Sequence, residues 1–183
     1  MLLVAFSLLC LLQFEQSYAS VITVYNGGPW GDWGTMEKCP AGTRAAAFSL
    51  KVEREQGNGD DTALNGISLY CVNTNFQVVK TITSSVGQWG DWKPVQWCPS
   101  GYLQAFCLRV EGSQGRGDDT AANNIKFKCS SGEIIEGNGL HWGNYGAWSD
   151  TCHQGINGLN IKLEKPQGDG DDTSVNDVQF NCV

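Results

Sequence analysis

The sequence predicts an all-β protein built from three repeats, and three observations support this prediction. A Gly-Asp-Asp-Thr motif occurs three times, at residues 59–62, 117–120 and 170–173, and its surroundings align without a gap. Alternating apolar and polar residues flank each copy, which is the pattern of a β-strand. No window of about 11 residues shows a convincing helical period, and 23 glycines among 183 residues disfavour helices. Spacing of this kind indicates a repeated architecture.

An apolar leader precedes the repeats. Residues 1–12 are almost all apolar, and Ser17 and Ala19 place small side chains where a signal peptidase cleaves. We therefore expect residues 1–19 to be a signal peptide, residues 20–183 to form a single domain, and the protein to be secreted. The leader contains no Lys or Arg, and a buried N-terminal helix is the alternative interpretation. Because the apolar run is too short to span a bilayer, membrane insertion is not expected.

The charge of the chain limits its partners. The formal net charge is -7 at pH 7, and no run of basic residues occurs. Nucleic acids and anionic membranes are bound by clustered Lys and Arg, so neither is an expected partner. No Gly-rich phosphate loop follows a strand and opens a helix, and no cofactor is therefore expected.

In chain order, the first element is a strand that leads to a tryptophan motif. Residues 21–25 are mostly β-branched and are followed by Asn26-Gly27-Gly28-Pro29, which indicates a strand that enters a turn. The next residues are Trp30-Gly31-Asp32-Trp33, and residues 89–92 repeat them. We align the third copy, which is less exact, with Tyr145-Gly146-Ala147-Trp148.

Two alternating strands follow in each repeat. The first lies at residues 48–53 and recurs at 106–111 and 159–164, and the second, such as residues 125–129, follows the Gly-Asp-Asp-Thr motif. Because alternate side chains are apolar, we expect one face of each strand to be buried and the other to face water.

A third strand completes each repeat. Polar turns follow Cys71 and Cys129, and β-branched segments come next at residues 78–79 and 134–135. No such strand follows Cys182. We expect residues 21–23 to supply it, so that the termini meet and the first strand completes the last repeat, which protects a sheet edge. The repeats span about 20–71, 76–129 and 133–182.

The cysteines follow the same threefold pattern. Six of the seven that remain after the leader occupy equivalent positions near the start and the end of each repeat. Pairing within each repeat is the simplest symmetric solution, and the predicted disulfides are Cys39 with Cys71, Cys98 with Cys129 and Cys152 with Cys182. Each such bond stabilises a secreted fold by about 3 to 4 kcal/mol in the chain-entropy model. Cys107 is left over, and both a free thiol and an intermolecular bond remain open.

The paired aspartates of the repeated motif invite a catalytic interpretation. The pairs are Asp60 with Asp61, Asp118 with Asp119 and Asp171 with Asp172. Glycosidases place two carboxylates about 5 to 10 Å apart across a sugar bond, whereas adjacent residues of a strand point to opposite faces. Aspartates in turns accept hydrogen bonds from nearby backbone N–H groups, so we prefer a structural turn role. Calcium is an alternative at residues 169–172, but the order of ligands in an EF-hand is absent, and neither a metal site nor catalytic residues are expected.

The seven tryptophans are ambiguous, because an exposed ring can stack on a sugar and a buried ring packs a core. Trp33, Trp92 and Trp148 recur in every repeat, which favours a structural role, whereas Trp97 and Trp142 break the symmetry. Packing is the preferred interpretation for the rings as a group.

If a glycan site exists, we hypothesise that it lies near the Asp150 end of the loop at residues 142–149. Trp142 or Tyr145 would be the stacking platform and Asn144 a hydrogen-bonding partner. The basis is that this loop holds an extra aromatic residue and an extra Asn relative to residues 89–92. Added loop residues on a rigid scaffold are common positions for binding groups.

Three long motifs of the chain recur in order. They are Gly27-Gly28-Pro29-Trp30-Gly31-Asp32-Trp33, Asp60-Asp61-Thr62-Ala63-Leu64-Asn65-Gly66-Ile67 and Gly117-Asp118-Asp119-Thr120-Ala121-Ala122-Asn123-Asn124-Ile125. With these motifs, the whole chain after the leader resembles the vitelline membrane outer layer protein I family. The resemblance implies a β-prism of three Greek-key sheets packed about a pseudo-threefold axis. It also implies an extracellular role in the outer coat of the egg or in related secretions.

Two functions from different classes remain. The first is a structural or protective protein of an extracellular coat, such as the outer layer of the egg vitelline membrane, with other coat proteins as partners and no enzymatic activity. It explains the leader and the disulfides. It also explains why the sequence offers no group of catalytic residues that breaks the threefold symmetry. The second is a carbohydrate-binding, lectin-like or chito-oligosaccharide-acting protein. It relies on the fact that β-prisms also house lectins, which is an analogy of fold.

Overall fold

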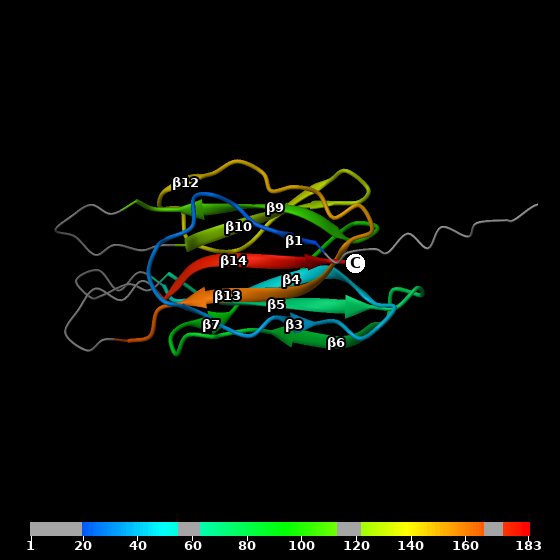
Figure 1. Ribbon diagram of the computed structural model, residues 1–183, viewed down its shortest axis with the longest axis horizontal. Helices are drawn as coiled ribbons and strands as arrows, with labels where there is room; N and C mark the ends of the chain where they lie inside the picture. The colour runs from blue at the N-terminus through cyan, green and yellow to red at the C-terminus, as the bar shows by residue number, and fades with distance from the viewer. Residues whose placement is uncertain (1–19, 55–62, 113–121, 167–173) are drawn as a thin grey trace, which may run out of the picture.

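The computed structural model describes residues 20–54, 63–112, 122–166 and 174–183. The expected leader and all six aspartates of the Gly-Asp-Asp-Thr motifs lie outside these residues. The described residues form fourteen β-strands in three sheets, so the all-β prediction is confirmed. The long strands run along the long axis of the molecule (Figure 1).

The first sheet is a Greek key. Its strands β4 (Arg44–Val52), β5 (Leu64–Val72), β6 (Val78–Thr83) and β7 (Asp91–Trp92) lie in the order β6-β5-β4-β7, and β8 (Gln96–Trp97) also pairs with β4. The fourth strand along the chain thus returns to lie beside the first, which defines the Greek key.

The second sheet repeats this arrangement. It contains β9 (Leu103–Val110), β10 (Ala122–Cys129), β11 (Ile134–Glu136) and β12 (Asn144–Tyr145) in the order β11-β10-β9-β12. All of its strand pairs are antiparallel.

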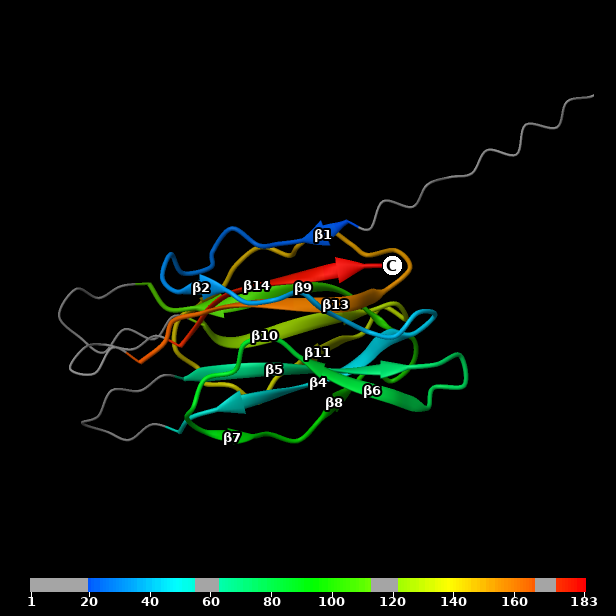
Figure 2. The ribbon, with the colours of Figure 1, turned by 60° about the horizontal axis from the view of Figure 1, so that its bottom comes forward.

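The third sheet combines both ends of the chain. It contains β13 (Ile156–Leu163), β14 (Val175–Cys182), β1 (Val21–Ile22) and β2 (Asp32–Trp33) in the order β1-β14-β13-β2, and β3 (Glu37–Lys38) also pairs with β13. Strand β1 runs antiparallel to β14, beside the C-terminus (Figure 2). The prediction that the first strand completes the last repeat is therefore confirmed.

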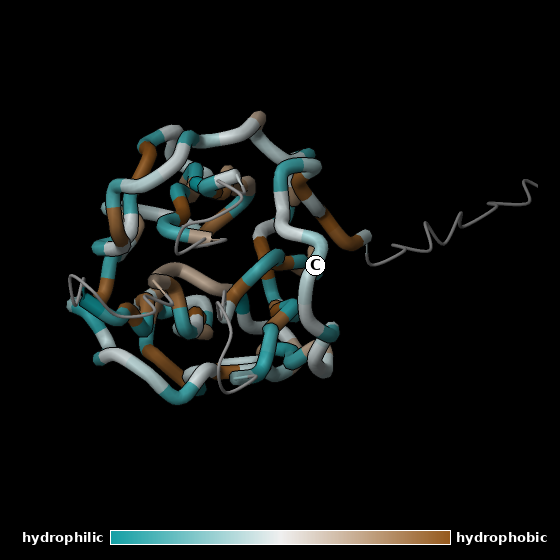
Figure 3. The backbone as a smooth tube through the Cα atoms, turned by 90° about the vertical axis from the view of Figure 1, so that its left-hand side faces the viewer, coloured by the Kyte–Doolittle hydropathy of each residue, from teal (hydrophilic) through white to brown (hydrophobic). Residues whose placement is uncertain are grey.

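The three sheets form the sides of a β-prism around a shared core (Figure 3). Phe48, Phe106, Phe127 and Phe180 are fully buried and come from all three sheets. The ring centres of Phe127 lie 4.7 Å from Phe48 and 5.1 Å from Phe180, and those of Phe106 and Phe180 are 4.7 Å apart. This aromatic cluster therefore joins the sheets at the axis.

The disulfides tie neighbouring sheets together. Their bonds join Cys39 to Cys71, Cys98 to Cys129 and Cys152 to Cys182, which is the pairing that the repeats predict. The opening strands of each repeat belong to the sheet of the repeat before it, so the two cysteines of a pair lie on different sheets. The backbone N–H group of each opening cysteine donates to a carbonyl oxygen of the preceding sheet. Cys39 donates to Asn157 in β13, Cys98 to Ala46 in β4, and Cys152 to Gln104 in β9. The Cys39–Cys71 disulfide thus links the third sheet to the first, Cys98–Cys129 links the first to the second, and Cys152–Cys182 links the second to the third. Together the three disulfides close a ring.

The expectation of one buried and one wet face is wrong for the first sheet. In β4 and β5, Ser49 and Ser68 on the outward face are only 2% and 4% exposed, and their hydroxyl oxygens lie 3.5 Å apart. A Cβ added at Gly66, on the same face, would lie 3.2 Å from Val86 and 3.5 Å from the Trp92 ring. Large side chains from the returning segment cover these small residues, so both faces are buried.

Cys107 takes the position of Ser49 in the second sheet. It is 3% exposed and unpaired, on the face of β9 opposite the core side chains of Phe106 and Leu108. Burial raises the pKa of its thiol. An intermolecular disulfide at this position would require the strand to open.

None of the described residues forms a helix with the length and apolar character that a membrane crossing requires.

Candidate functional site

The tryptophan motif is a device that holds a short strand against each sheet. Gly31, Gly90 and Gly143 have φ values of 78°, 77° and 72°, in the left-handed region that glycine favours. A Cβ on any of them would lie 2.2 to 2.4 Å from the backbone of the neighbouring strand, at Leu163, Val52 or Val110. Glycine is therefore required at this position for both conformation and space.

A basic side chain fixes each copy of the motif. Lys51 Nζ donates to the carbonyl oxygens of Gly87 and Gln88, at 2.8 and 2.9 Å. Arg109 and Lys162 occupy the equivalent positions, and they donate to the carbonyls of His141 and Pro29. These three cations are therefore engaged with the loops that precede the tryptophan motifs.

The register corrects the alignment of the third copy. Tyr145 pairs with Arg109 as Trp92 pairs with Lys51, so the third copy is Trp142-Gly143-Asn144-Tyr145. The expectation that residues 145–148 are the third copy is wrong, and Trp148 is not the counterpart of Trp92. Trp142 is instead equivalent to Trp30 and Trp89, so the loop contains no extra aromatic at this point. The asymmetry that supported a glycan site at Trp142, Asn144 and Tyr145 is therefore absent.

Tyr145 is held by several contacts within the second sheet. Its hydroxyl donates to Glu136 Oε1 at 2.7 Å, Lys126 Nζ lies 4.1 Å from its ring centre, and Arg109 Cζ lies 4.6 Å from it. Burial and the bond to Glu136 raise the pKa of Tyr145, so the hydroxyl stays protonated as a donor. Asn144 is exposed in β12, and Trp142 is 42% exposed with its ring centre 4.3 Å from that of His141. Of the three, Trp142 is the residue that offers an exposed ring.

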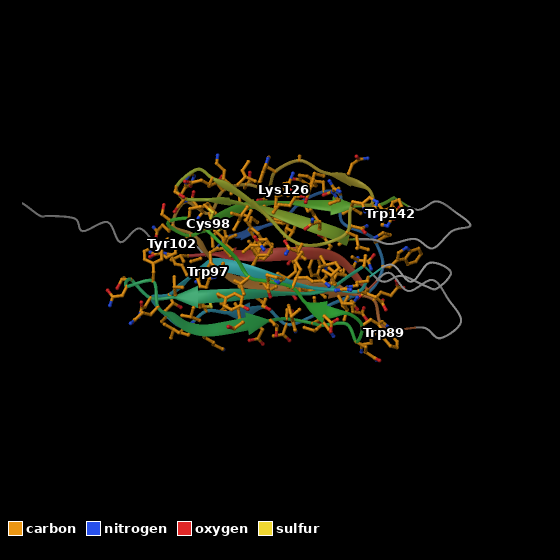
Figure 4. The ribbon with its side chains drawn as sticks, turned by 180° about the vertical axis from the view of Figure 1, so that it is seen from behind. Trp89, Trp97, Cys98, Tyr102, Lys126 and Trp142 are labelled. Carbon is orange, nitrogen blue, oxygen red and sulfur yellow. A yellow bond between two sulfur atoms is a disulfide. The ribbon has the colours of Figure 1, made fainter. Side chains whose placement is uncertain are left out.

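All seven tryptophans are at least 39% exposed. The rings therefore do not lie in the hydrophobic core, although Trp92 packs over Gly66 on the outward face of the first sheet. Trp89 and Trp142 lie at one end of the prism, where the strands joined by the Gly-Asp-Asp-Thr segments end, and Trp97 lies toward the other (Figure 4). We call these the loop end and the disulfide end.

A small hollow, open to solvent, lies at the loop end between the first and third sheets. Asn65, Trp89, Glu164 and Ser174 contribute to its lining. The Asn65 side chain is buried, and its Oδ1 accepts from Ser174 Oγ at 3.1 Å and from the Trp89 backbone N–H at 3.4 Å. Asn65 therefore joins two sheets, and its oxygen is already engaged.

At the disulfide end, a group of aromatic side chains surrounds a guanidinium, and we call it the aromatic–guanidinium platform. Phe76 stacks on Tyr102, with ring centres 5.3 Å apart and planes 16° apart, and Arg44 Cζ lies 5.1 Å from the Tyr102 ring centre. Tyr70 and Trp97 form a second pair, with ring centres 5.8 Å apart. The platform thus spans the junction of the first and second sheets.

The strand register brings the two pairs together. Trp97 and Tyr70 both pair with Ala47, and Arg44 pairs with Val72. Because Tyr70 and Val72 are two residues apart on one face of β5, Arg44 and the Tyr70–Trp97 pair lie against that strand about 7 Å apart. Phe76 and Trp97 are 51% and 44% exposed, so the platform presents ring surface to solvent.

Of this platform, the sequence singles out Trp97 alone. Phe76, Tyr102, Tyr70 and Arg44 were missed because they are scattered over three segments of the chain. The sequence offered no signal for Phe76, because it follows Cys71 by five residues whereas Gly132 follows Cys129 by three, and their equivalence is visible only in the hydrogen bonds of the two turns. No group of three or more His, Cys, Asp or Glu side chains suited to a metal ion occurs within the described residues.

The fold and the surface define a class of protein. It is a β-prism of three Greek-key sheets, with disulfides between neighbouring sheets and exposed tryptophan side chains. The model of the family described as Vitelline membrane outer layer protein I (VOMI) matches residues 20–183. The chain belongs to this family. It is 50% identical over 171 residues to the vitelline membrane outer layer protein 1 homolog of Mus musculus, and 52% identical over 171 residues to that of Homo sapiens. Each match covers 92% of this chain and 85% of the relative.

Several solved structures have a similar fold, and lectins are among them. Calystegia sepium agglutinin matches with a TM-score of 0.56 at 12% identity, over 90% of this chain and 96% of the lectin. Artocarpin, in a complex with mannotriose, matches with a TM-score of 0.54 at 12% identity, over 91% and 99%. A mannose-specific jacalin-related lectin from Morus nigra matches with a TM-score of 0.52 at 16% identity, over 91% and 96%. At these identities the likeness concerns the fold alone.

Proposed function

We propose that this protein is a secreted, non-enzymatic structural component of an extracellular coat, such as the outer layer of the egg vitelline membrane. The observation that carries the proposal is the ring of three disulfides that joins each sheet to both of its neighbours. Such cross-links form and persist in oxidising, extracellular compartments and limit unfolding of the chain. Membership of the vitelline membrane outer layer family supports the same function.

Secretion and retention in a coat test this proposal together. The full chain is expressed in animal cells, recovered from the medium and incubated with isolated egg vitelline membranes, with a disulfide-bonded serum protein as the control. We expect recovery from the medium and retention on the membranes after washes at physiological salt. A chain that stays inside the cell, or that washes off like the control, contradicts the proposal.

Carbohydrate binding is the second candidate function, and the exposure of all seven tryptophans favours it. A Trp side chain has an apolar body and a polar N–H group, and such side chains are enriched at interfaces. The lectins above share the prism, which supports the idea by analogy of fold only. We propose Trp142 as one contact, with Asn144 and Tyr145 beside it.

A fluorescence titration with chito-oligosaccharide tests the Trp142 contact. Saturable quenching that disappears in a folded Trp142→Ala variant supports it, whereas no change at millimolar ligand contradicts it. The sizes of the oligosaccharides are measured after prolonged incubation, and we expect them to stay unchanged because the protein is proposed to be non-enzymatic.

A further inference from the structure

We propose that the aromatic–guanidinium platform of Arg44, Tyr70, Phe76, Trp97 and Tyr102 binds an acidic sugar. The aromatic rings would stack on the apolar face of the sugar, and Arg44 would pair with its carboxylate or sulfate. This inference rests on the proposed carbohydrate-binding function and assigns to it a site and a class of ligand.

The conformation of Phe76 is the first observation. Phe76 has a φ of 57°, which is an outlier for a bulky side chain. Its turn is closed by hydrogen bonds from Asn73 N–H to the Gln77 carbonyl and from Phe76 N–H to the Asn73 carbonyl. The turn of the second sheet has the same two bonds, from Cys129 to Glu133 and from Gly132 to Cys129, and Gly132 takes the positive φ of 101°.

Glycine is thus the residue that this turn geometry favours. The first sheet has a phenylalanine there, half exposed and stacked on Tyr102 across the sheet junction. A strained residue whose side chain is displayed at the surface is typical of ligand contacts, since folding alone does not select it.

The second observation is the state of Arg44. In the described part of the chain, no acidic side chain pairs with Arg44 and no hydrogen bond from its guanidinium is formed; its Nε is buried without a partner. The guanidinium lies over the Tyr102 ring, with Arg44 Cζ 5.1 Å from the ring centre. The guanidinium therefore retains donors in a fork that fits a carboxylate or sulfate.

The charge around the platform also suits an anion, although the whole protein is acidic. Three lysines lie near the disulfide end. In the strand ladders, Lys80 lies opposite Cys71, Lys128 opposite Ala105 and Lys38 opposite Gly158. Glu37, Glu133 and Asp150 are the acids placed among them. Glu53, Glu111 and Glu164 follow the strand ends at the loop end, where Lys51, Arg109 and Lys162 also lie.

The third observation is that the other two sheet junctions lack the platform. At the positions of Trp97 and Tyr70, the third sheet has Lys38 and Asn181, both opposite Gly158. The second sheet has Lys128 at the position of Tyr70. A structural requirement of the prism would apply to all three junctions, whereas this feature occurs at one of them.

The exposed rings favour a sugar over a peptide. Phe76 and Trp97 lie on the outward face with about half of their surface free, so a ligand lies against them. The anchor residues of a protein partner instead fill buried, desolvated pockets. A flat pyranose ring with one acidic group matches both the ring surface and the single guanidinium.

The test compares three ligands that share one core: lactose, lactose 3′-sulfate and 3′-sialyllactose. Binding to the full secreted chain is followed by isothermal titration and by ligand-observed NMR. We expect saturable binding of at least one anionic ligand and binding of lactose that is weaker by at least about tenfold, since one charge-assisted pair is lost. The two anionic arms distinguish a sulfate from a carboxylate.

Two variants locate the binding. Phe76→Gly copies the turn of the second sheet, so we expect it to fold with a melting temperature close to that of the wild type and to lose most of the binding. Arg44→Gln should lower the affinity for the anionic ligand by at least about tenfold and change the affinity for lactose little. Trp30→Ala is the control, because Trp30 is 61% exposed at the opposite end of the prism.

Three outcomes overturn the proposal. They are no saturable binding of either anionic ligand, equal binding of lactose, and binding that persists in both folded platform variants. Binding that persists in those variants but is lost in Trp142→Ala rejects this site and leaves carbohydrate binding intact. Tighter binding of the acidic peptide acetyl-Glu-Tyr-Glu-amide than of either anionic lactose identifies a protein partner instead.

Discussion

Gly90 and Phe76 show how a positive φ is used at two kinds of position. At Gly90 the conformation and the lack of a side chain let a short strand approach Val52. At Phe76 the same region of φ holds a large exposed ring, at a cost of about 1 to 2 kcal/mol for a non-glycine residue. The first use builds the fold, and the second is where we place a ligand.

Cys107 should behave as a protected free thiol. Its 3% exposure and raised pKa keep the thiolate, which is the reactive form, scarce and covered. We expect native protein at pH 8 to react with iodoacetamide far more slowly than protein unfolded in guanidinium without reductant. One labelled thiol should appear on unfolding. Rapid native labelling, or no labelled thiol after unfolding, contradicts the buried free thiol.

At the scale of elements, the two-residue strands β2, β7 and β12 are too short to be held by their own ladders. Each depends on a glycine that touches the neighbouring backbone and on a basic side chain that binds the loop before it. The sequence showed the motif, yet it offered two aromatic-Gly pairs in the third repeat, at residues 142–143 and 145–146. Only the register and the backbone angle of Gly143 show which pair is equivalent.

A pair of glycine variants separates conformation from space. Gly42 and Gly90 have φ values of 76° and 77°, but a Cβ at Gly42 would meet nothing within 4 Å, whereas one at Gly90 would lie 2.3 Å from Val52. Gly42→Ala should lower the free energy of unfolding by about 1 to 2 kcal/mol. Gly90→Ala should cost about 1 to 3 kcal/mol more. Equal losses in urea unfolding would show that the close approach does not matter.

At the scale of the whole molecule, the sequence predicted the repeats, the strands, the cysteine pairs and the closure by the N-terminal strand. These features depend on local pattern and on threefold equivalence, which a sequence displays. The return of the tryptophan motif to the preceding sheet was not predicted, because strand pairing is not local: β7 and β8 follow Cys71 and β6 yet pair with β4. The platform was missed for the same reason, since its five residues meet only across a sheet junction.

The closure by β1 can be tested with neighbouring residues of that strand. Ile22 is 3% exposed within the shared core, whereas Val21 is 46% exposed. Ile22→Ala should lower the free energy of unfolding by about 2 to 4 kcal/mol, as for a residue in a central strand. Val21→Ala should cost less than about 0.5 kcal/mol. If Ile22→Ala were as mild as Val21→Ala in thermal unfolding, β1 would not be part of the core.

The central claim is that three inter-sheet disulfides close the prism into one cooperative unit. The cysteine pairs are 32, 31 and 30 residues apart, so the chain-entropy model gives each bond nearly the same contribution, about 3 to 4 kcal/mol. The measurement is guanidinium unfolding of three double variants, each with one pair changed to Ala, followed by tryptophan fluorescence and far-UV circular dichroism. We predict that all three variants lose a similar amount of unfolding free energy. Each should unfold in a single transition that has the same midpoint by both probes. Separate transitions, or a loss confined to one variant, would contradict a closed ring.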